Sequence, residues 1–192
     1  MYIIFEGIDT CGKSTQIERL KQLYPHILTT KEPAGTPFGQ TAREILLSGQ
    51  LHSKRAELFL FLADRAEHYT QLIKPNQPHK MILSDRGFLS GIAYALANGS
   101  DDFEFLINLN RFALEDTMPD RIILFVTDMQ TLKDRTSQKM LDDIELRGLE
   151  YLLEVQRHMK ESLKKLDIPF TLIDATQNIE TITDELIKTL DL

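Results

Sequence analysis

The stretch FEGIDTCGKST, residues 5–15, decides the fold of this 192-residue chain. It carries the pattern G-x-x-x-x-G-K-[ST], which starts at Gly7 and ends at Ser14. The apolar run YIIF (2–5) precedes the pattern, and an amphipathic segment (13–23) follows it. A glycine-rich loop between a buried strand and a helix is the context in which this pattern binds phosphate. The stretch therefore predicts a nucleotide-binding loop.

Each position of the loop has an expected task. Backbone N–H groups wrap the phosphates of a nucleotide, and the N-terminus of the following helix adds positive potential. Lys13 is expected to bridge the β- and γ-phosphates of ATP, and the Ser14 hydroxyl to bind Mg²⁺. The predicted phosphate-binding residues of the ATP site are Gly7, Ile8, Asp9, Thr10, Cys11, Gly12, Lys13, Ser14 and Thr15.

A second acidic residue is expected near the metal. The stretch MILSDR (81–86) places Asp85 and Arg86 directly after an apolar, β-rich run. Such a pair is often a surface ion pair only, but after a buried strand in a phosphate-loop protein it is expected to reach the phosphates or their metal. We predict Mg²⁺, carried with ATP, at Ser14 and Asp85. The five histidines lack metal-ligand spacing and the single cysteine forms no cluster, so no other metal is expected.

Short β-rich runs alternate with amphipathic segments along the whole chain. Alternation of this kind predicts an α/β fold with a parallel sheet covered on both faces. The prediction is a five-stranded P-loop NTPase fold that forms one domain over residues 1–192. The expected strands are 2–5, 26–30, 81–84, 121–126 and 170–173, and the expected helices are 13–23, 38–47, 54–73, 89–97, 103–114, 144–166 and 179–190.

One segment fits neither pattern. Residues 136–143, TSQKMLDD, carry no strand alternation and no strong helical periodicity. We predict a short flexible lid over the nucleotide at about residues 136–148. An ordinary exposed connection is the alternative.

The composition and charge of the chain exclude several classes of protein. The net charge of −7 leaves no broad basic face, so no nucleic-acid partner is expected. No apolar run reaches membrane-spanning length, and the start MYIIFEG lacks the features of a secretory signal. One cysteine excludes an internal disulfide. These features predict a cytoplasmic protein without a membrane partner.

The arginines indicate the acceptor. The chain is short and lacks the N-K-x-D sequence of guanine-specific proteins, which favours a small-molecule kinase. Arg43, Arg65 and Arg86 could all face the loop, and guanidinium forks suit phosphate. An ionised phosphate acceptor needs no strong base, so positioning and charge neutralisation suffice. Asp9 could instead serve as the base for a hydroxyl acceptor. The predicted catalytic residues are Lys13, Arg86 and Asp9.

Six motifs share the order and spacing of one family. They are FEGIDTCGKSTQ (5–16), TKEPAGT (30–36), ELFLFLADRAEH (57–68), SDRGFLSGIAY (84–94), LDDIE (141–145) and LIDATQNIE (172–180). Over essentially its full length the chain resembles the bacterial thymidylate kinases. The resemblance implies transfer of the γ-phosphate of ATP to dTMP, giving dTDP and ADP in dTTP synthesis, by a homodimer.

The resemblance also implies roles at the acceptor site. Phe61 matches the aromatic residue that stacks on thymine, and Arg65, four residues on, matches the residue that hydrogen-bonds the base. Asp9 matches the acid that takes the 3′-hydroxyl, and Tyr94 the aromatic residue that disfavours ribose. Arg43 and Arg86 match the phosphate clamp, and Ser90 and Gly91 fall in the base pocket, although Gly91 offers no side chain. The implied dTMP-binding residues are Asp9, Arg43, Phe61, Arg65, Arg86, Ser90 and Tyr94.

The loop DATQ (174–177) resembles the segment that embraces adenine. Ala175 and Thr176 are then expected to contact adenine through backbone groups. Arg135 would lie against the adenine face, with a solvated arginine at a helix end as the alternative.

The chain departs from the family pattern in its cations. Family members carry a catalytic arginine either in the phosphate loop or in the lid, but position 10 is a threonine and Asp143 stands where a lid arginine is common. Lys139, Arg135 or Arg147 could supply the charge.

Ala34 replaces a common glycine, which matters only if that position needs a positive φ. Cys11 is expected to be a buried thiol, with an oxidation switch as the alternative.

Two other functions remain open. One is a deoxynucleoside kinase or another nucleotide kinase with the same core. The other is a nucleotide-binding protein that has lost catalysis and acts as a partner or sensor.

The segment ELFLFLAD (57–64) is apolar around much of its helix, which predicts burial in a homodimer. A central core helix is the alternative.

Overall fold

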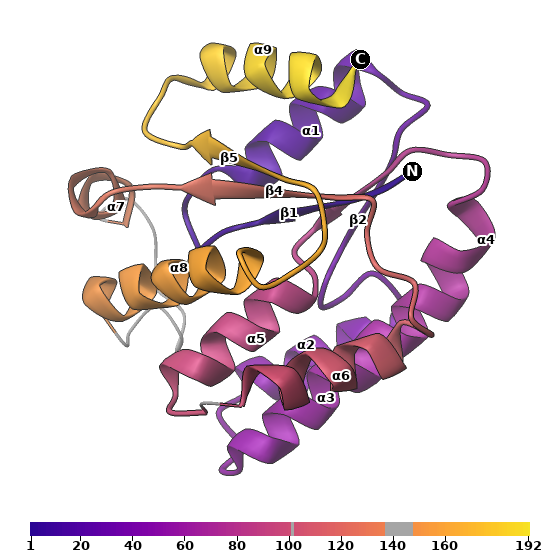
Figure 1. Cartoon of the computed structure of the whole chain (residues 1–192), viewed down its shortest axis with the longest axis vertical. Coiled ribbons are helices and arrows are strands. Elements are labelled where there is room, and N and C mark those ends of the chain that lie inside the picture. The colour runs from indigo at the N-terminus through magenta and orange to yellow at the C-terminus, as the bar shows by residue number, and fades with distance from the viewer. Residues whose placement is uncertain (101, 137–147) are drawn as a thin grey trace.

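The computed structural model describes residues 1–100, 102–136 and 148–192. Five parallel strands form one sheet in the order β2-β3-β1-β4-β5 (Figure 1). The bounds are β1 Tyr2–Glu6, β2 Leu28–Lys31, β3 Ile82–Asp85, β4 Arg121–Val126 and β5 Phe170–Asp174. The register places Phe5 of β1 opposite Asp85 of β3 and Ile123 of β4. The predicted parallel five-stranded sheet is confirmed.

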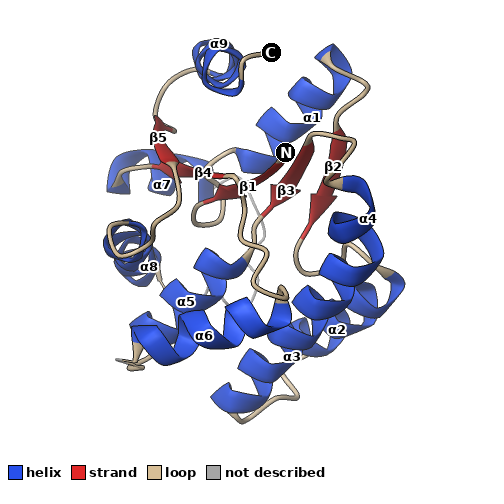
Figure 2. Cartoon of the chain, turned by 45° about the vertical axis from the view of Figure 1, so that its right-hand side comes forward, coloured by secondary structure: helices blue, strands red, loops and turns tan. Residues whose placement is uncertain are grey.

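Helices cover both faces of this sheet (Figures 1 and 2). On one face lie α1 (Lys13–Leu23) and α9 (Ile179–Leu190), which contact each other. The other face is covered by α5 (Phe88–Ala97) and α8 (Leu149–Leu163), with α6 (Phe103–Ala113) next to α5. The remaining helices are α2 Pro37–Leu47, α3 Lys54–His68, the π-helical turn η1 Tyr69–Ile73, α4 Lys74–Asn76 and α7 Met129–Thr136.

Alternating strand residues build the two layers of the core. In β1, Tyr2 and Ile4 join the cluster formed with α5, α6 and α8, whereas Ile3 and Phe5 join the cluster formed with α1 and α9. Successive side chains of a strand point to opposite faces, so a strand buried on both sides reads as a continuous apolar run. This is why the run from residue 2 to residue 5 has no polar alternation.

Helix boundaries differ from the predictions at three places. The predicted helix 54–73 ends as an α-helix at His68 and continues as η1. α7 was not predicted, because its sequence MQTLKDRT carries little apolar periodicity. α8 begins at Leu149, and the first residues of the predicted helix 144–166 lie outside the described residues. The predicted lid also lies outside the described residues, except for Thr136 and Gly148 at its ends. The candidate cations Lys139 and Arg147 lie outside them too.

The topology fixes where a ligand can bind. β1 is the central strand, and the chain fills the sheet first on its β3 side and then on its β4 side. In open parallel sheets, ligands bind at the carboxyl ends of the strands where the strand order reverses. The loop after β1 lies at that point. Within the described residues, no helix is long and apolar enough to cross a membrane.

Candidate active site

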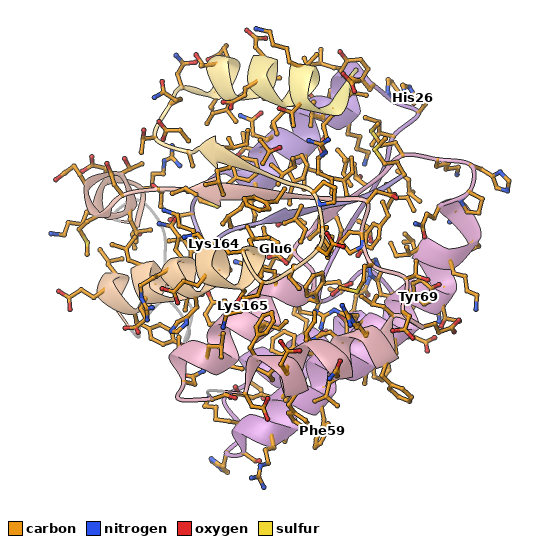
Figure 3. All side chains as sticks on the ribbon, viewed as in Figure 1. Glu6, His26, Phe59, Tyr69, Lys164 and Lys165 are labelled. Atoms are coloured by element: carbon orange, nitrogen blue, oxygen red, sulfur yellow. The ribbon has the colours of Figure 1, made fainter. Side chains whose placement is uncertain are left out.

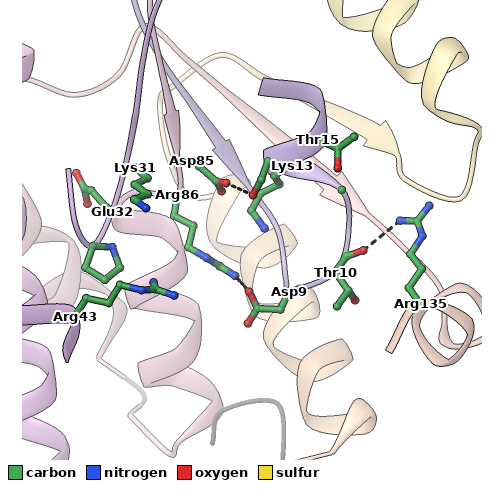
Figure 4. Close-up of a pocket in the computed structure, with 13 residues that line it drawn as sticks. Asp9, Thr10, Lys13, Thr15, Lys31, Glu32, Arg43, Asp85, Arg86 and Arg135 are labelled. Atoms are coloured by element: carbon green, nitrogen blue, oxygen red, sulfur yellow. Dashed lines mark hydrogen bonds and ion pairs between the residues drawn. The ribbon is translucent and has the colours of Figure 1, made fainter. Parts of the chain in front are cut away.

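A cleft of about 520 Å³ opens beside the loop that follows β1 (Figure 4). Five of its lining residues are lysine or arginine and three are aspartate or glutamate, so the cleft is cationic in a chain of net charge −7. A cationic cleft in an acidic protein favours an anionic ligand. The lining residues are Asp9, Thr10, Gly12, Lys13, Ser14, Thr15, Lys31, Glu32, Pro33, Arg43, Asp85, Arg86 and Arg135.

The loop needs glycine at both of its ends. Gly7 has a φ of 145°, and a Cβ there would lie 2.8 Å from both Cys11 Sγ and the Phe125 carbonyl oxygen. Gly12 has a φ of 93° and sits at the start of α1, where no described side chain caps the helix. The first backbone N–H groups of α1 are therefore left to bind an anion. Cys11 is buried, as predicted for a packed thiol.

Lys13 folds over the loop. Its side chain is buried, and its Nζ donates hydrogen bonds to the carbonyl oxygens of Gly7 (2.9 Å) and Ile8 (3.0 Å). Both acceptors are neutral carbonyl groups. A phosphate carries the charge opposite to that of the Lys13 ammonium and attracts it more strongly than a neutral carbonyl does, so it can replace these acceptors.

Ser14 and Asp85 meet at the carboxyl end of β3. The Ser14 hydroxyl donates a 2.5 Å hydrogen bond to Asp85 Oδ2. A hydroxyl and a carboxylate oxygen in contact suit a hard cation such as Mg²⁺, which takes only one or two protein ligands and keeps several waters. Among the described residues, no group of three or more His, Cys, Asp or Glu side chains could hold a metal by itself.

Arg86 joins the loop to α5. Its Nη1 donates to the Gly7 carbonyl oxygen and to Ser90 Oγ, each at 3.0 Å, and its Nη2 forms an ion pair with Asp9. Burial opposes the charge of Arg86, but the carboxylate of Asp9, with further help from Tyr94, raises the pKa of the guanidinium above its usual value. Arg86 is therefore a permanent cation at the centre of the cleft.

Glu6 was missed in the sequence, although it stands inside the opening stretch. Its fully buried carboxylate accepts hydrogen bonds from the backbone N–H groups of Gly87 (3.0 Å) and Ser90 (3.2 Å) and from the Ser90 hydroxyl (2.5 Å). Burial raises the pKa of Glu6, although the hydrogen bonds from Ser90 act to lower it. The carboxylate fixes the start of α5. A charged residue at the end of a buried strand was the available signal.

Arg65 lies in a buried network behind the cleft. Its Nε donates to Glu32 Oε2 at 2.9 Å, and its Nη2 forms an ion pair with the same oxygen at 2.8 Å. Its Nη1 donates to Asn110 Oδ1 at 2.5 Å. The other oxygen of Glu32 bonds His68 Nδ1 at 2.9 Å. Burial opposes the charge of Glu32, but Arg65 and His68 outweigh it and lower the pKa of the carboxyl. Glu32, His68 and Asn110 were not predicted, although Glu32 and His68 stood in quoted motifs.

The other predicted acceptor residues lie around this network. Arg43 is exposed on α2 and its guanidinium reaches into the cleft (Figure 4). Phe61 and Tyr94 are half-buried, and the Tyr94 ring packs against the ring of Tyr151. The Ser90 hydroxyl bridges Glu6 and Arg86. A Cβ at Gly91 would lie 4.0 Å from Arg65 Nη1.

Arg135, at the end of α7, ties the phosphate loop to the loop after β5. Its Nη1 donates to the Thr10 carbonyl oxygen at 3.3 Å and its Nη2 to the Ala175 carbonyl oxygen at 2.7 Å. The exposed Thr176 hydrogen-bonds Asp174. Two loops that are more than a hundred residues apart thus share one arginine.

The cleft brings together most of the predicted residues but not all of them. Of the phosphate-loop residues, Gly7, Ile8 and Cys11 lie beneath the surface that lines it. The predicted residues that do not line it are Phe61, Arg65, Ser90, Tyr94, Ala175 and Thr176. Contact between Arg86 and Ser90 connects the cleft to α5 and so to the side where Gly91 and Arg65 meet.

Comparisons with known proteins agree along the whole chain. A family model described as "Thymidylate kinase" matches residues 5–186. The chain is 67% identical over 190 residues to the thymidylate kinase of Sulfurovum sp. (strain NBC37-1), with 99% of each chain covered. It is 51% identical over 191 residues to the thymidylate kinase of Nautilia profundicola, with 99% of this chain and 96% of the relative covered.

A solved structure supports the same assignment. The crystal structure of thymidylate kinase from Ehrlichia chaffeensis superposes with a TM-score of 0.77 at 29% identity and covers 100% of this chain and 98% of the other. The fold, the phosphate loop and the full-length relatives agree. The chain therefore belongs to the thymidylate kinase family and, with ATP, phosphorylates dTMP to dTDP.

Proposed function

We propose that the cleft performs this reaction by charge neutralisation and positioning, within one domain that spans residues 1–192. The observation that carries the proposal is the contact of Arg86 with both Gly7 of the phosphate loop and Ser90 of α5. A cation at this junction can neutralise the acceptor phosphate and the transferred phosphoryl group together. An ionised phosphate is already the nucleophile, so no general base is required.

On the donor side, the loop 7–15 binds the phosphates of ATP and Lys13 bridges the β- and γ-phosphates. Ser14 and Asp85 hold Mg²⁺, which supplies charge for the phosphoryl group. The oxygen pair described above supports this assignment. When ATP enters, Lys13 exchanges its two carbonyl acceptors for phosphate oxygens.

On the acceptor side, Arg43 and Arg86 bind the phosphate of dTMP, and Asp9 accepts the 3′-hydroxyl. Phe61 stacks on thymine, Arg65 and the region of Ser90 recognise the base, and Tyr94 disfavours ribose. The exposure of Arg43 and the half-buried aromatic rings support these roles, because a ligand can still reach them.

Arg135 has two candidate roles at the adenine end. With Ala175 and Thr176 it binds adenine, and its contact with Thr10 also makes it the candidate for the missing catalytic cation among the described residues. The variant Arg135→Ala separates the two roles. A higher KM for ATP with an unchanged kcat indicates adenine binding, whereas a lower kcat with an unchanged KM indicates a catalytic cation.

The first test is an ADP-release assay with MgATP and four acceptors: dTMP, dUMP, the ribonucleotide of thymine, and thymidine. We expect turnover to be highest with dTMP, lower with dUMP and the ribonucleotide, and absent with thymidine. Preference for thymidine would overturn the phosphate clamp and make Asp9 a candidate base. Arg43→Ala is expected to raise the KM for dTMP and to leave the KM for ATP unchanged.

We also propose that the protein forms a homodimer through α2, α3 and α6, which pack together at one end of the molecule (Figures 1 and 2). Phe59, Phe105 and Phe112 are 60%, 54% and 87% exposed on α3 and α6. Phe59 points away from the chain (Figure 3). Several exposed aromatic side chains on adjacent helices are typical of an interface between proteins.

Sedimentation velocity tests the dimer. The wild-type protein is expected to sediment as a dimer at low micromolar concentration, and Phe112→Asp as a monomer. Leu23→Asp, at an exposed apolar residue at the end of α1, is the matched control and should remain dimeric. A wild-type protein that is monomeric at this concentration contradicts the proposal.

A further inference from the structure

We infer that Asn110, on α6, is a positioning residue for base recognition: its carboxamide oxygen holds the Arg65 guanidinium in the orientation that selects a carbonyl edge of the pyrimidine. The inference rests on the role proposed above for Arg65. Neither the motifs nor the predicted site contained Asn110, which lies 45 residues from Arg65 in the sequence.

Arg65 is held from two directions. Glu32 accepts a hydrogen bond from its Nε and forms an ion pair with its Nη2, and Asn110 accepts a hydrogen bond from its Nη1. The side chains of Arg65 and Glu32 are 4% and 3% exposed, and Asn110 is 1% exposed. One carboxylate fixes one edge of the guanidinium, and the amide oxygen of Asn110 fixes the opposite end. Together they define the plane of the group.

The orientation of the Asn110 amide follows from its partners. A guanidinium only donates hydrogen bonds, so the amide oxygen must face Arg65. Its Nδ2 then donates to the Leu106 carbonyl oxygen at 2.8 Å, one turn earlier in α6. A flipped amide would place its NH₂ group against the N–H donors of Arg65 and its oxygen against the Leu106 carbonyl oxygen. Both halves of the amide are therefore committed to a single orientation.

This arrangement leaves a donor for a ligand. Arg65 has five N–H groups, and its hydrogen bonds to Glu32 and Asn110 use two of them, while Nη2 also forms an ion pair with Glu32. The second N–H of Nη1 remains for a ligand. Nη1 lies next to α5, since a Cβ at Gly91 would be 4.0 Å from it. Position 91 has no polar side chain, so the remaining donor of Arg65 defines the polarity of this side of the base pocket.

The fixed donors determine which base is accepted. Thymine and uracil present a carbonyl oxygen at C4, whereas cytosine presents an amino group there. A guanidinium whose orientation is fixed pairs with the oxygen and opposes the amino group. If Asn110 is lost, the Arg65 guanidinium can rotate and its discrimination weakens.

The test compares dUMP with dCMP, which differ only at this edge of the ring. We expect Asn110→Leu to lower kcat/KM for dUMP and dTMP on the order of 10-fold through KM, with kcat and the KM for ATP nearly unchanged. The ratio of kcat/KM for dUMP to that for dCMP should fall by a similar factor. Asn110→Asp keeps the oxygen facing Arg65 and should restore most of that ratio.

Three further variants make the test specific. Asn110→Ser, whose hydroxyl is too short to reach Nη1, replaces Asn110→Leu if the latter does not fold. Asn108→Leu makes the same change at an exposed position of α6 and should leave the ratio unchanged. Arg65→Met should remove the discrimination, and Asn110→Leu added to it should remove nothing further, because Asn110 acts through Arg65.

The outcomes separate this inference from the role of Arg65. If Arg65→Met removes the discrimination but Asn110→Leu and Asn110→Ser lower kcat/KM for dUMP and for dCMP by the same factor, Asn110 is only structural and the inference is wrong. If Arg65→Met itself leaves the ratio unchanged, the role proposed for Arg65 fails, and the inference fails with it.

Discussion

The two ends of the cleft hold their cations in different ways. At the phosphate end, Lys13 and Arg86 donate to backbone carbonyl groups, and Arg86 pairs with Asp9, whose side chain is 26% exposed. At the base end, Arg65 donates to Glu32, whose side chain is 3% exposed. Phosphate oxygens can replace neutral carbonyls and a partly hydrated carboxylate. The buried carboxylate of Glu32 is bonded to both Arg65 and His68, so its displacement by a substrate would be costly.

The difference separates moving parts from scaffold. Cations at the phosphate end must change partners in every catalytic cycle, so weak and partly exposed partners suit them. In the role proposed above, Arg65 selects a base by shape and polarity, so strong and buried partners suit it. Removal of a partner at the base end should therefore affect stability and acceptor binding, whereas removal of a cation at the phosphate end should affect turnover.

The largest effect is expected for Glu32→Gln. This change leaves Arg65 buried with a neutral partner and also weakens the bond to His68. Breaking a buried pair costs about 3–5 kcal/mol in the free energy of unfolding. Chemical denaturation measures this loss, and steady-state kinetics should show a higher KM for dTMP with the KM for ATP unchanged. Glu44→Gln, at an exposed position of α2, is the control. Equal loss in both variants would contradict a scaffold role.

The next effect is expected for Lys13→Met. Loss of a preorganised donor to the transferred phosphoryl group should lower kcat by about 10²- to 10³-fold. The free energy of unfolding should change little, because Lys13 gives up only two carbonyl oxygens and the weakly accepting sulfur of Cys11. Lys21→Met changes an exposed lysine on the same helix and should leave kcat unchanged. Thermal unfolding and single-turnover kinetics distinguish the two effects, and a large loss of stability in Lys13→Met would remove the contrast between the ends.

The phosphate end could be predicted from sequence because its parts are local. Strand, loop and helix start lie within about 20 residues, and the glycine positions follow from the backbone conformation that the loop requires. Asp85 could be placed because the strand before it is visibly apolar. Strands β1, β3 and β4 were predicted for the same reason, since each is a mostly buried run. Strands β2 and β5, at the two edges of the sheet, are partly exposed and were predicted from their apolar and β-branched residues.

The base end could not be predicted because its parts are distant. Glu32 and Asn110 come from a loop and a helix that only the tertiary fold brings to Arg65. A buried asparagine in an amphipathic helix looks like any other polar position. Glu6 gave a signal, a charge at the end of a buried strand, but its partners at the start of α5 lie about 80 residues away. Only the resemblance suggested that Arg65 mattered for a base.

A third prediction concerns Asp64, the neighbour of Arg65. It is 1% exposed, its Oδ1 accepts no hydrogen bond within the described residues, and burial raises the pKa of its carboxyl from 3.8 to about 6. The folded protein therefore binds this proton more tightly than the unfolded chain. Stability from this group is present below pH 4 and is lost as the pH rises to about 6.

The variant Asp64→Asn tests this effect. A shift of about two pKa units corresponds to a free energy of unfolding of about 1–3 kcal/mol. The variant should be more stable than the wild-type protein at pH 8 by about this amount, and the difference should vanish near pH 4. Glu6 also has a raised pKa, but it contributes to both proteins and cancels in the difference. A constant difference between pH 4 and pH 8 would show that the Asp64 carboxyl does not titrate in this range.

The smallest effect is expected for Ala34, the position where a glycine is common in the family. It has a φ of 91°, a region that favours glycine, and it lies in the loop between Glu32 and α2. The backbone of Ala34 lowers the pKa of the Asp64 carboxyl, so the strained backbone lies beside the base end. A non-glycine residue in a left-handed conformation costs about 1–2 kcal/mol. Glycine removes this cost, but its greater freedom in the unfolded chain offsets part of the gain in stability.

Ala34→Gly should therefore raise the free energy of unfolding by about 0.5–1 kcal/mol and leave kcat unchanged. Ala42→Gly makes the same chemical change inside α2, where helical backbone favours alanine, and should lower stability by about 1 kcal/mol. Urea denaturation of the two variants side by side gives opposite signs if the backbone conformation is the cause. Equal signs would mean that Ala34 is not strained, and that the base end is held by its hydrogen bonds without cost to its backbone.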